Sequence, residues 1–134
     1  TVNLLPRVLA FEAARDAGAA EALWVDPDGC IREGLSCNVF AWIEGRLVTP
    51  PLTGRILAGI TRSTVLDLVD AQGHPAAEDC IPVPGIRAAE EVFICSTTRE
   101  IIPVVRIDDQ VIGDGRPGAR TRAVLAAYRE KARD

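Results

Sequence analysis

Residues 39–49 read VFAWIEGRLVT, and this stretch decides which kind of fold the chain can adopt. Two short apolar runs, residues 39–43 and 46–49, flank the pair Glu44-Gly45. Such runs favour strands, and a glycine in a two-residue connection favours a tight hairpin. The stretch therefore predicts two antiparallel strands joined by a short turn, and Pro50-Pro51 ends this β-rich region.

The sequence on both sides predicts further strands, with few helices between them. Turn signals occur at residues 26–29 (Asp-Pro-Asp-Gly), 96–99 and 108–109. Since strands alternate with only three helices, an α/β or α+β domain is expected. A family resemblance described below adds the expectation of a mixed, barrel-like β-sheet with flanking helices. Strands are predicted at 21–26, 30–33, 91–95 and 101–107, a short extended segment at 79–84, a loop at 52–60, and helices at 1–18, at 61–71 and from Pro117 onward.

Composition limits the kind of protein and its partners. The chain has 134 residues, 48% of them hydrophobic, and this length and composition fit one domain with a single core. Its net charge is −4. Basic and acidic residues are interspersed, so nucleic-acid binding is not expected. No long apolar run or signal segment is evident, so we expect no membrane association and a cytoplasmic location.

The four cysteines show no metal-ligand spacing. Cys30, Cys37, Cys80 and Cys95 form no C-x-x-C pair, and His74 is the only histidine. We therefore expect reduced, mostly buried thiols and no metal site.

Two glycine-rich segments match nucleotide-binding motifs only in part. Residues 113–118 spell G-x-G-x-x-G, but no second strand with an acidic residue follows at the required distance. Residues 54–59 lack the Lys-Ser/Thr of a P-loop. Gly59-Ile60-Thr61 nevertheless opens a helix, where free N–H groups favour an anion. A purely structural N-terminal threonine is the alternative.

Two further polar positions are candidates for ligand contact. Ser96, Thr97 and Thr98 place three hydroxyls in a turn that could form a second anion-binding concavity, unless it is simply a solvated turn. Glu33 precedes Gly34 between two predicted strands and could pair with a cation, although an ordinary surface glutamate fits equally well.

In order and spacing, these signals resemble the class IV aminotransferases, the fold-type IV enzymes that use pyridoxal 5′-phosphate (PLP). Within the class the chain is most similar to D-amino-acid aminotransferases, through the hydroxyl turn and the ending at 112–122. Branched-chain aminotransferases tend to carry Gly-Thr-Ala at that turn. The matching segments are Asn3-Leu-Leu, Glu21-Ala-Leu, Glu33-Gly-x-x-x-Asn-Val-Phe, Thr49-Pro-Pro, Ile56-Leu-x-Gly-Ile-Thr-Arg62, Glu90-Glu-Val-Phe and Ser96-Thr-Thr-x-Glu-Ile-x-Pro-Val104.

The resemblance implies that one cofactor unites the candidate residues. Ile60 and Thr61 would bind the PLP phosphate at the helix N-terminus, and Ser96 and Thr97 would close around it from the turn.

The resemblance also assigns residues to the ring of the cofactor. Glu33 would hold the proton of the pyridine nitrogen, so that the ring acts as an electron sink. Leu57 would pack on the ring face, and Asn38 would support the glutamate loop.

The family's catalytic lysine would stand immediately before Thr1. The only lysine is Lys131, which lies near the other end, remote from every cofactor motif. Residues 1–134 are thus expected to be the C-terminal cofactor-binding domain of a homodimeric enzyme, inactive alone because the lysine and the N-terminal domain are missing.

The expected reaction is transamination between an amino acid, preferably a D-amino acid, and a 2-oxo acid. The alternatives are a branched-chain aminotransferase, an aminodeoxychorismate lyase, and a non-catalytic fragment or pseudoenzyme domain.

Overall fold

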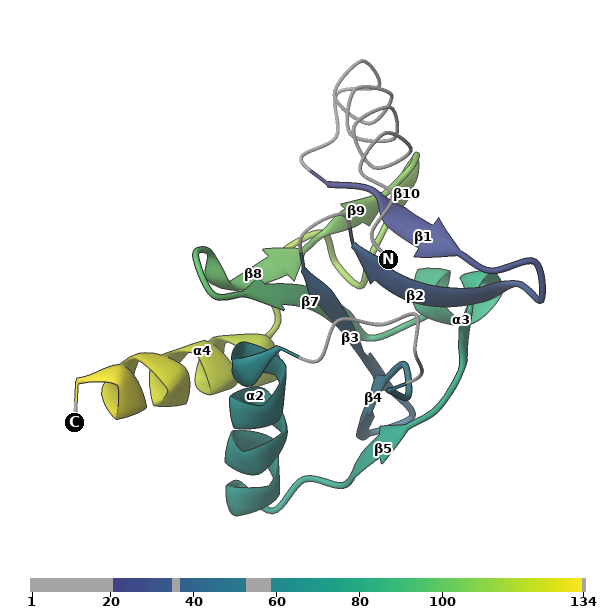
Figure 1. The fold of residues 1–134 in the computed structure, drawn as a ribbon. Coiled ribbons are helices and arrows are strands. Elements are labelled where there is room, and N and C mark those ends of the chain that lie inside the picture. Colours follow the sequence, from purple (N-terminus) through teal and green to yellow (C-terminus); the bar gives the residue numbers. More distant parts are fainter. Residues whose placement is uncertain (1–20, 35–36, 53–58, 134) are drawn as a thin grey trace.

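The computed structural model describes residues 21–34, 37–52 and 59–133 (Figure 1). Strands and helices alternate, which confirms the expected α/β class. The elements in chain order are β1 (Leu23–Val25), β2 (Cys30–Gly34), β3 (Asn38–Ile43), β4 (Arg46–Thr49), α2 (Ile60–Ala71), β5 (Ala76–Glu78), β6 (Ile81–Pro82), α3 (Val83–Arg87), β7 (Glu91–Ser96), β8 (Glu100–Val104), β9 (Arg106–Ile107), β10 (Gln110–Val111) and α4 (Ala119–Ala132).

A five-stranded sheet in the order β5-β4-β3-β7-β8 forms the centre of the fold. The hairpin predicted from residues 39–49 is confirmed, since β3 and β4 pair antiparallel. Its turn places Glu44 at φ 52° and Gly45 at φ 80°, as a two-residue hairpin requires. On the other side β3 pairs antiparallel with β7 over five residue pairs. The central strand β3 is thus buried between two neighbours, and five of its six residues are buried.

The remaining strands form smaller sheets. β1, β2 and β6 make a three-stranded sheet, and β9 and β10 a two-stranded one. Among the described residues the pairings leave three separate sheets, so the barrel-like part of the prediction is not seen as a closed barrel. The mixed sheet with flanking helices is confirmed.

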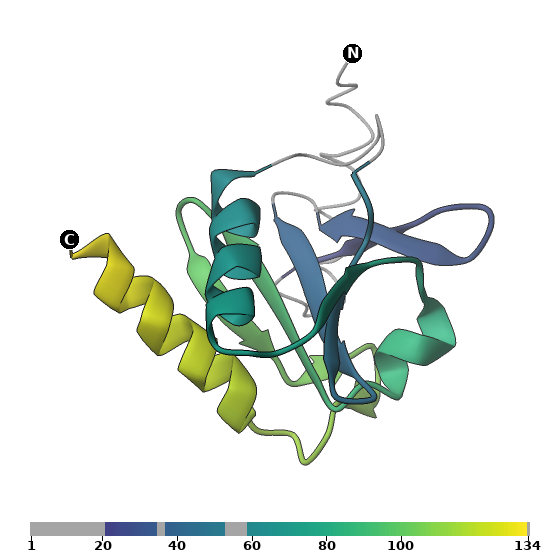
Figure 2. The ribbon, with the colours of Figure 1, turned by 90° about the horizontal axis from the view of Figure 1, so that it is seen from below.

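Alternation along β3 divides the core between the two faces of the central sheet. Phe40 and Trp42 point to one face, where they join residues of α2 and α4. Val39 and Ala41 point to the other face, where they pack with residues of β2, β6 and α3. Figure 2 shows this layering, with α2 and α4 on one side and α3 and β2 on the other.

Three element predictions need correction. No helix was expected at α3, yet Val83 and Pro84 occupy its first turn, where proline costs no hydrogen bond. α4 begins at Ala119 rather than at Pro117, because Gly118 is its extended N-cap. The predicted strand 101–107 is divided between β8 and β9. The helix predicted at 1–18 lies outside the described residues.

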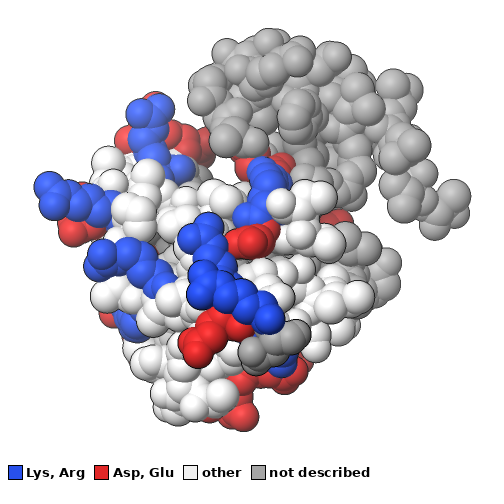
Figure 3. All heavy atoms as spheres, turned by 90° about the vertical axis from the view of Figure 1, so that its left-hand side faces the viewer, with Lys and Arg blue, Asp and Glu red and all other residues white. Residues whose placement is uncertain are grey.

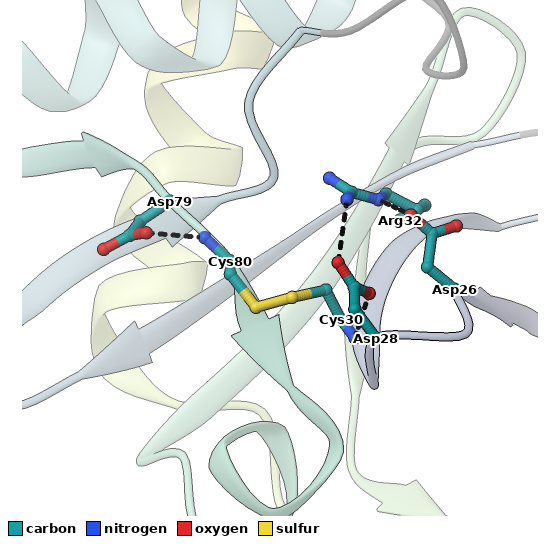
Figure 4. A network of polar contacts seen from close by, with 6 residues as sticks. All are labelled: Asp26, Asp28, Cys30, Arg32, Asp79 and Cys80. Carbon is teal, nitrogen blue, oxygen red and sulfur yellow. Dashed lines mark hydrogen bonds and ion pairs between the residues drawn. A yellow bond between two sulfur atoms is a disulfide. The ribbon is translucent and has the colours of Figure 1, made fainter.

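The cysteine prediction is wrong for two of the four residues. Cys30 and Cys80 form a disulfide with a Cα–Cα distance of 5.5 Å, whereas Cys37 and Cys95 are buried thiols that take no part in a disulfide. The antiparallel pairing of β2 with β6 brings the bonded pair together across 50 residues of sequence. Figure 4 shows this bridge beside the Asp26, Asp28 and Arg32 ion pairs.

Candidate functional site

Among the described residues, no side chain caps the N-terminus of α2. Its N-cap is Gly59, which has extended backbone and no side chain to cap the first turn. The helix carries no acidic residue in that turn. Because the first N–H groups of a helix have no partner within it, and the helix dipole is positive there, this end favours an anion.

A small cavity of about 60 Å³ lies at this helix end. β3 begins and β7 ends here, since Asn38 and Cys95 are partners in the antiparallel register. The same register places the turn after β7 beside the start of α2. The cavity is lined by Cys37, Asn38, Gly59, Thr61, Cys95, Ser96 and Thr97.

The hydroxyl turn is fixed by its own hairpin. Ser96 pairs with Glu100 at the end of the β7–β8 ladder, and Glu100 has φ 57°, which closes the three-residue connection. The Arg99 main-chain N–H donates to Ser96 Oγ at 3.0 Å. A hydroxyl oxygen that accepts still has its proton to donate. Ser96 can therefore donate into the cavity, beside Thr97.

Asn38 and Gly59 fit closely at the opposite wall. Asn38 is buried, and a Cβ added to Gly59 would lie 3.0 Å from Asn38 Oδ1. A larger residue at position 59 would push this amide from its place. The glycine thus lets the helix end approach β3 closely.

The Cys95 thiol of the cavity stays protonated near neutral pH. Burial raises the pKa of Cys95 to about 12, and neighbouring Cys37 acts in the same direction, against a lowering effect of Arg62. Arg62 itself is buried and donates to Pro50 O at 3.0 Å and to Glu78 Oε1. The described surroundings of the cavity thus combine hydroxyl and amide donors with the buried cation of Arg62.

The structure brings four of the seven predicted site residues together: Asn38, Thr61, Ser96 and Thr97. Glu33 is buried near the end of β2, outside the cavity lining. The Ile60 side chain is 84% exposed, so only its main chain can contribute. Leu57 lies outside the described residues.

Two lining residues were missed by sequence reasoning. Cys37 and Cys95 directly precede the predicted Asn38 and Ser96, and only the β3–β7 register shows that they meet at one cavity. In the sequence, the one indication of their role is that each directly precedes a residue of a polar motif, since neither cysteine belongs to such a motif itself.

The other long helix offers no comparable site. The Glu91 carboxylate occupies the N-terminus of α4, accepting from Thr121 N–H at 2.9 Å and from Arg120 Nε at 2.8 Å. A Cβ on Gly118 would come within 2.1 Å of that carboxylate. The G-x-G-x-x-G segment before α4 therefore serves packing, in agreement with its rejection as a dinucleotide fingerprint.

A larger open hollow of about 490 Å³ lies at the opposite end of β3. It includes Glu44 and Glu90 in its lining, and Glu90 Oε1 already accepts from Gly45 N–H at 2.9 Å. Two carboxylates and no helix N-terminus make this hollow unsuited to an anion.

Three further features bear on the expected partners. Within the described ranges, no three His, Cys, Asp or Glu side chains are grouped to hold a metal. No described helix is long and apolar enough to cross a membrane. On the face that carries α4, basic and acidic side chains lie side by side (Figure 3).

Comparison with known proteins identifies the family. A family model described as amino-transferase class IV matches residues 1–107. The chain belongs to the class IV aminotransferases.

Relatives of two named specificities resemble this class IV chain. A D-alanine aminotransferase of Bacillus licheniformis is 42% identical over 95% of the chain and 44% of its own length. A branched-chain amino acid aminotransferase of Escherichia coli matches with TM-score 0.91 and 34% identity, over 96% of the chain and 42% of its own. The PLP-form branched-chain enzyme of Thermobaculum terrenum matches with TM-score 0.89 and 36% identity, over 96% and 43%. The chain thus spans less than half the length of these relatives.

Proposed function

We propose that the cavity between α2 and the hydroxyl turn binds the phosphate of PLP. The observation that carries this proposal is the meeting of an uncapped helix N-terminus with the side chains of Thr61, Ser96 and Thr97 around one small cavity. A phosphate needs several directed donors and no competing carboxylate. Among the described residues the lining supplies hydroxyls, an amide and two thiols, and includes no Asp or Glu. The residues therefore fit this group.

Within this proposal each residue has a defined task. Thr61 and the main chain of Ile60 donate to the phosphate from the helix, and Ser96 and Thr97 donate from the turn. Asn38 supports the cavity wall against Gly59.

Glu33 and Leu57 would contact the ring of the cofactor. Glu33 would hold the proton on the pyridine nitrogen, and Leu57 would pack on the ring face, as the family resemblance implies. When bound, PLP supplies an electron-withdrawing ring conjugated to the substrate amine. The chain's own contribution is to anchor and orient that ring.

We propose that the complete protein catalyses transamination between a D-amino acid and a 2-oxo acid. Similarity to the D-alanine aminotransferase and the Ser-Thr-Thr turn support the D-amino acid. The solved branched-chain enzymes support a second candidate, branched-chain amino acids.

The chain itself would be the C-terminal cofactor-binding domain, catalytically inactive alone, with the catalytic lysine supplied by a preceding segment. A homodimer and a cytoplasmic location are part of the same proposal. The Cys30–Cys80 disulfide is evidence against the location, because such bridges are rare in the cytosol.

Two experiments test these proposals separately. Titration of the chain with pyridoxamine 5′-phosphate, pyridoxamine and inorganic phosphate tests the site. Pyridoxamine 5′-phosphate, which has both the ring and the phosphate, should bind more tightly than pyridoxamine or inorganic phosphate. Steady-state assays of the complete protein with D-alanine, D-glutamate, L-valine and L-leucine as amino donors test the reaction. Turnover of the L-amino acids alone would contradict the D-amino acid and support the branched-chain candidate.

A further inference from the structure

Arg99 is the last residue of the hydroxyl turn, and its side chain extends away from the β7–β8 hairpin. Its Nη2 donates to Glu21 Oε2 at 2.5 Å, across 78 residues of sequence. Glu21 stands two residues before β1, and its other oxygen accepts from Ala22 N–H at 3.2 Å. The ion pair therefore links the turn after β7 to the start of the β1–β2 hairpin.

The burial of this pair distinguishes it from the ordinary surface pairs of the chain. The Glu21 side chain is only 9% exposed, and Arg99 is 34% exposed. In the Arg129–Glu100 pair the two side chains are 59% and 40% exposed. Removing one partner of a buried, hydrogen-bonded ion pair leaves an uncompensated charge and is costly, whereas exposed pairs contribute little. Pairing with Glu21 raises the pKa of Arg99, against the effect of burial, and Cys37 of the cavity adds to the rise.

The two elements joined by the pair carry the two ends of the proposed cofactor site. The turn carries Ser96 at the phosphate cavity. β1 pairs with β2, with Leu23 opposite Gly34, and β2 carries Glu33. Because a cofactor has a fixed length, the donors at its phosphate and the carboxylate at its ring nitrogen must keep a fixed separation.

We propose that Arg99 is a positioning residue that, through Glu21, holds the phosphate-binding turn in place relative to the strand of Glu33. This inference rests on the proposed PLP site. Arg99 does not line the cavity and acts on the cofactor through the elements that it joins. Its main-chain bond to Ser96 Oγ does not depend on the side chain, so loss of the guanidinium leaves the local turn intact.

The test compares a ligand that contacts both the phosphate cavity and Glu33 with a ligand that contacts the phosphate cavity alone. Binding of pyridoxamine 5′-phosphate and of inorganic phosphate is measured on the wild-type chain and on R99Q. We expect R99Q to weaken pyridoxamine 5′-phosphate roughly tenfold and inorganic phosphate by no more than about twofold. R99K, which keeps the charge but not the planar fork, should recover part of the loss.

Matched variants separate positioning from general stability. R129Q removes the exposed pair to Glu100 on the same hairpin and should leave both affinities unchanged. E21Q should reproduce most of the R99Q loss, because the pair with Glu21 is the main interaction of Arg99 and its contact with Cys37 is the smaller one. The double variant should lose no more than R99Q, since R99Q already removes the pair. E21Q also provides the test if R99Q fails to fold.

The outcomes distinguish the two proposals. If wild type, R99Q and E21Q all bind pyridoxamine 5′-phosphate equally tightly, the role of Arg99 is overturned and the cofactor site is supported. An equal loss for both ligands also overturns it, because the effect then lies in the turn alone. Failure of wild type to bind pyridoxamine 5′-phosphate overturns the site and the positioning role together.

Discussion

Replacement of Thr61 by valine should weaken phosphate binding and leave the fold intact. Thr61 is the second residue of α2, is 4% exposed and lines the cavity. We expect its hydroxyl to donate to a phosphate bound in this cavity. Valine has nearly the same shape and removes only this donor. A hydrogen bond to a charged group contributes about 2 kcal/mol, which corresponds to roughly 30-fold in the dissociation constant.

The assay is calorimetric titration of pyridoxamine 5′-phosphate into wild type, T61V, T61S and a control. Thr121 provides the control, because it is also a buried threonine in the first turn of a helix with a glycine N-cap. There, however, the Glu91 carboxylate takes the place of an anion. T61V should bind weakly, T61S nearly as wild type, and T121V as wild type. Unchanged affinity in T61V, with wild-type melting behaviour, would refute the assignment of this helix end to the phosphate.

Three other properties can be tested on the chain. Reduction of the Cys30–Cys80 disulfide, which spans 50 residues, should lower the free energy of unfolding by about 4 kcal/mol in denaturant titrations with dithiothreitol; no change would contradict a bridge in the native state. Burial acts to raise the pKa of Glu91, but hydrogen bonds from Thr121 and Arg120 hold it below its usual value. The ionised Glu91 carboxylate therefore stabilises the fold at neutral pH, and this contribution is lost as the pH falls through the lowered pKa. E91Q should cost about 1 kcal/mol at pH 7 and progressively less in acid, and a cost independent of pH would count against the cap. Because the pKa of Cys95 is raised to about 12, native Cys95 should react with iodoacetamide at pH 8 roughly a thousandfold more slowly than a free thiol. Mass spectrometry can follow this labelling, and rapid labelling of the native chain would disprove the burial of Cys95.

Local patterns sufficed for the hairpins. The run 39–49 contains both its strands and the Glu44-Gly45 connection that turns the chain back, and no distant contact is needed to see it. The hydroxyl turn at 96–99 is similar, since Ser96 and Glu100 pair within one hairpin. Thr61 and Ser96 were therefore accessible as candidates from sequence and family resemblance.

Features that depend on pairing across the chain could not be predicted. The disulfide needs β6 beside β2, and the α4 cap needs Glu91 beside Gly118; neither juxtaposition has a local signal. The meeting of Cys37 and Cys95 at the cavity likewise follows from the register of β3 with β7. A barrel-like sheet was expected from the family, whereas the described pairings form three sheets.

The claim that the N-terminus of α2 and the hydroxyl turn hold the cofactor phosphate is tested most directly by NMR. In ¹H–¹⁵N spectra of the labelled chain, saturation with pyridoxamine 5′-phosphate should shift the amide signals of Ile60, Thr61, Ser96 and Thr97 most strongly, and pyridoxamine without phosphate should shift them far less. Shifts confined to the hollow beside Glu44 and Glu90, or no saturable shift at all, would contradict the account.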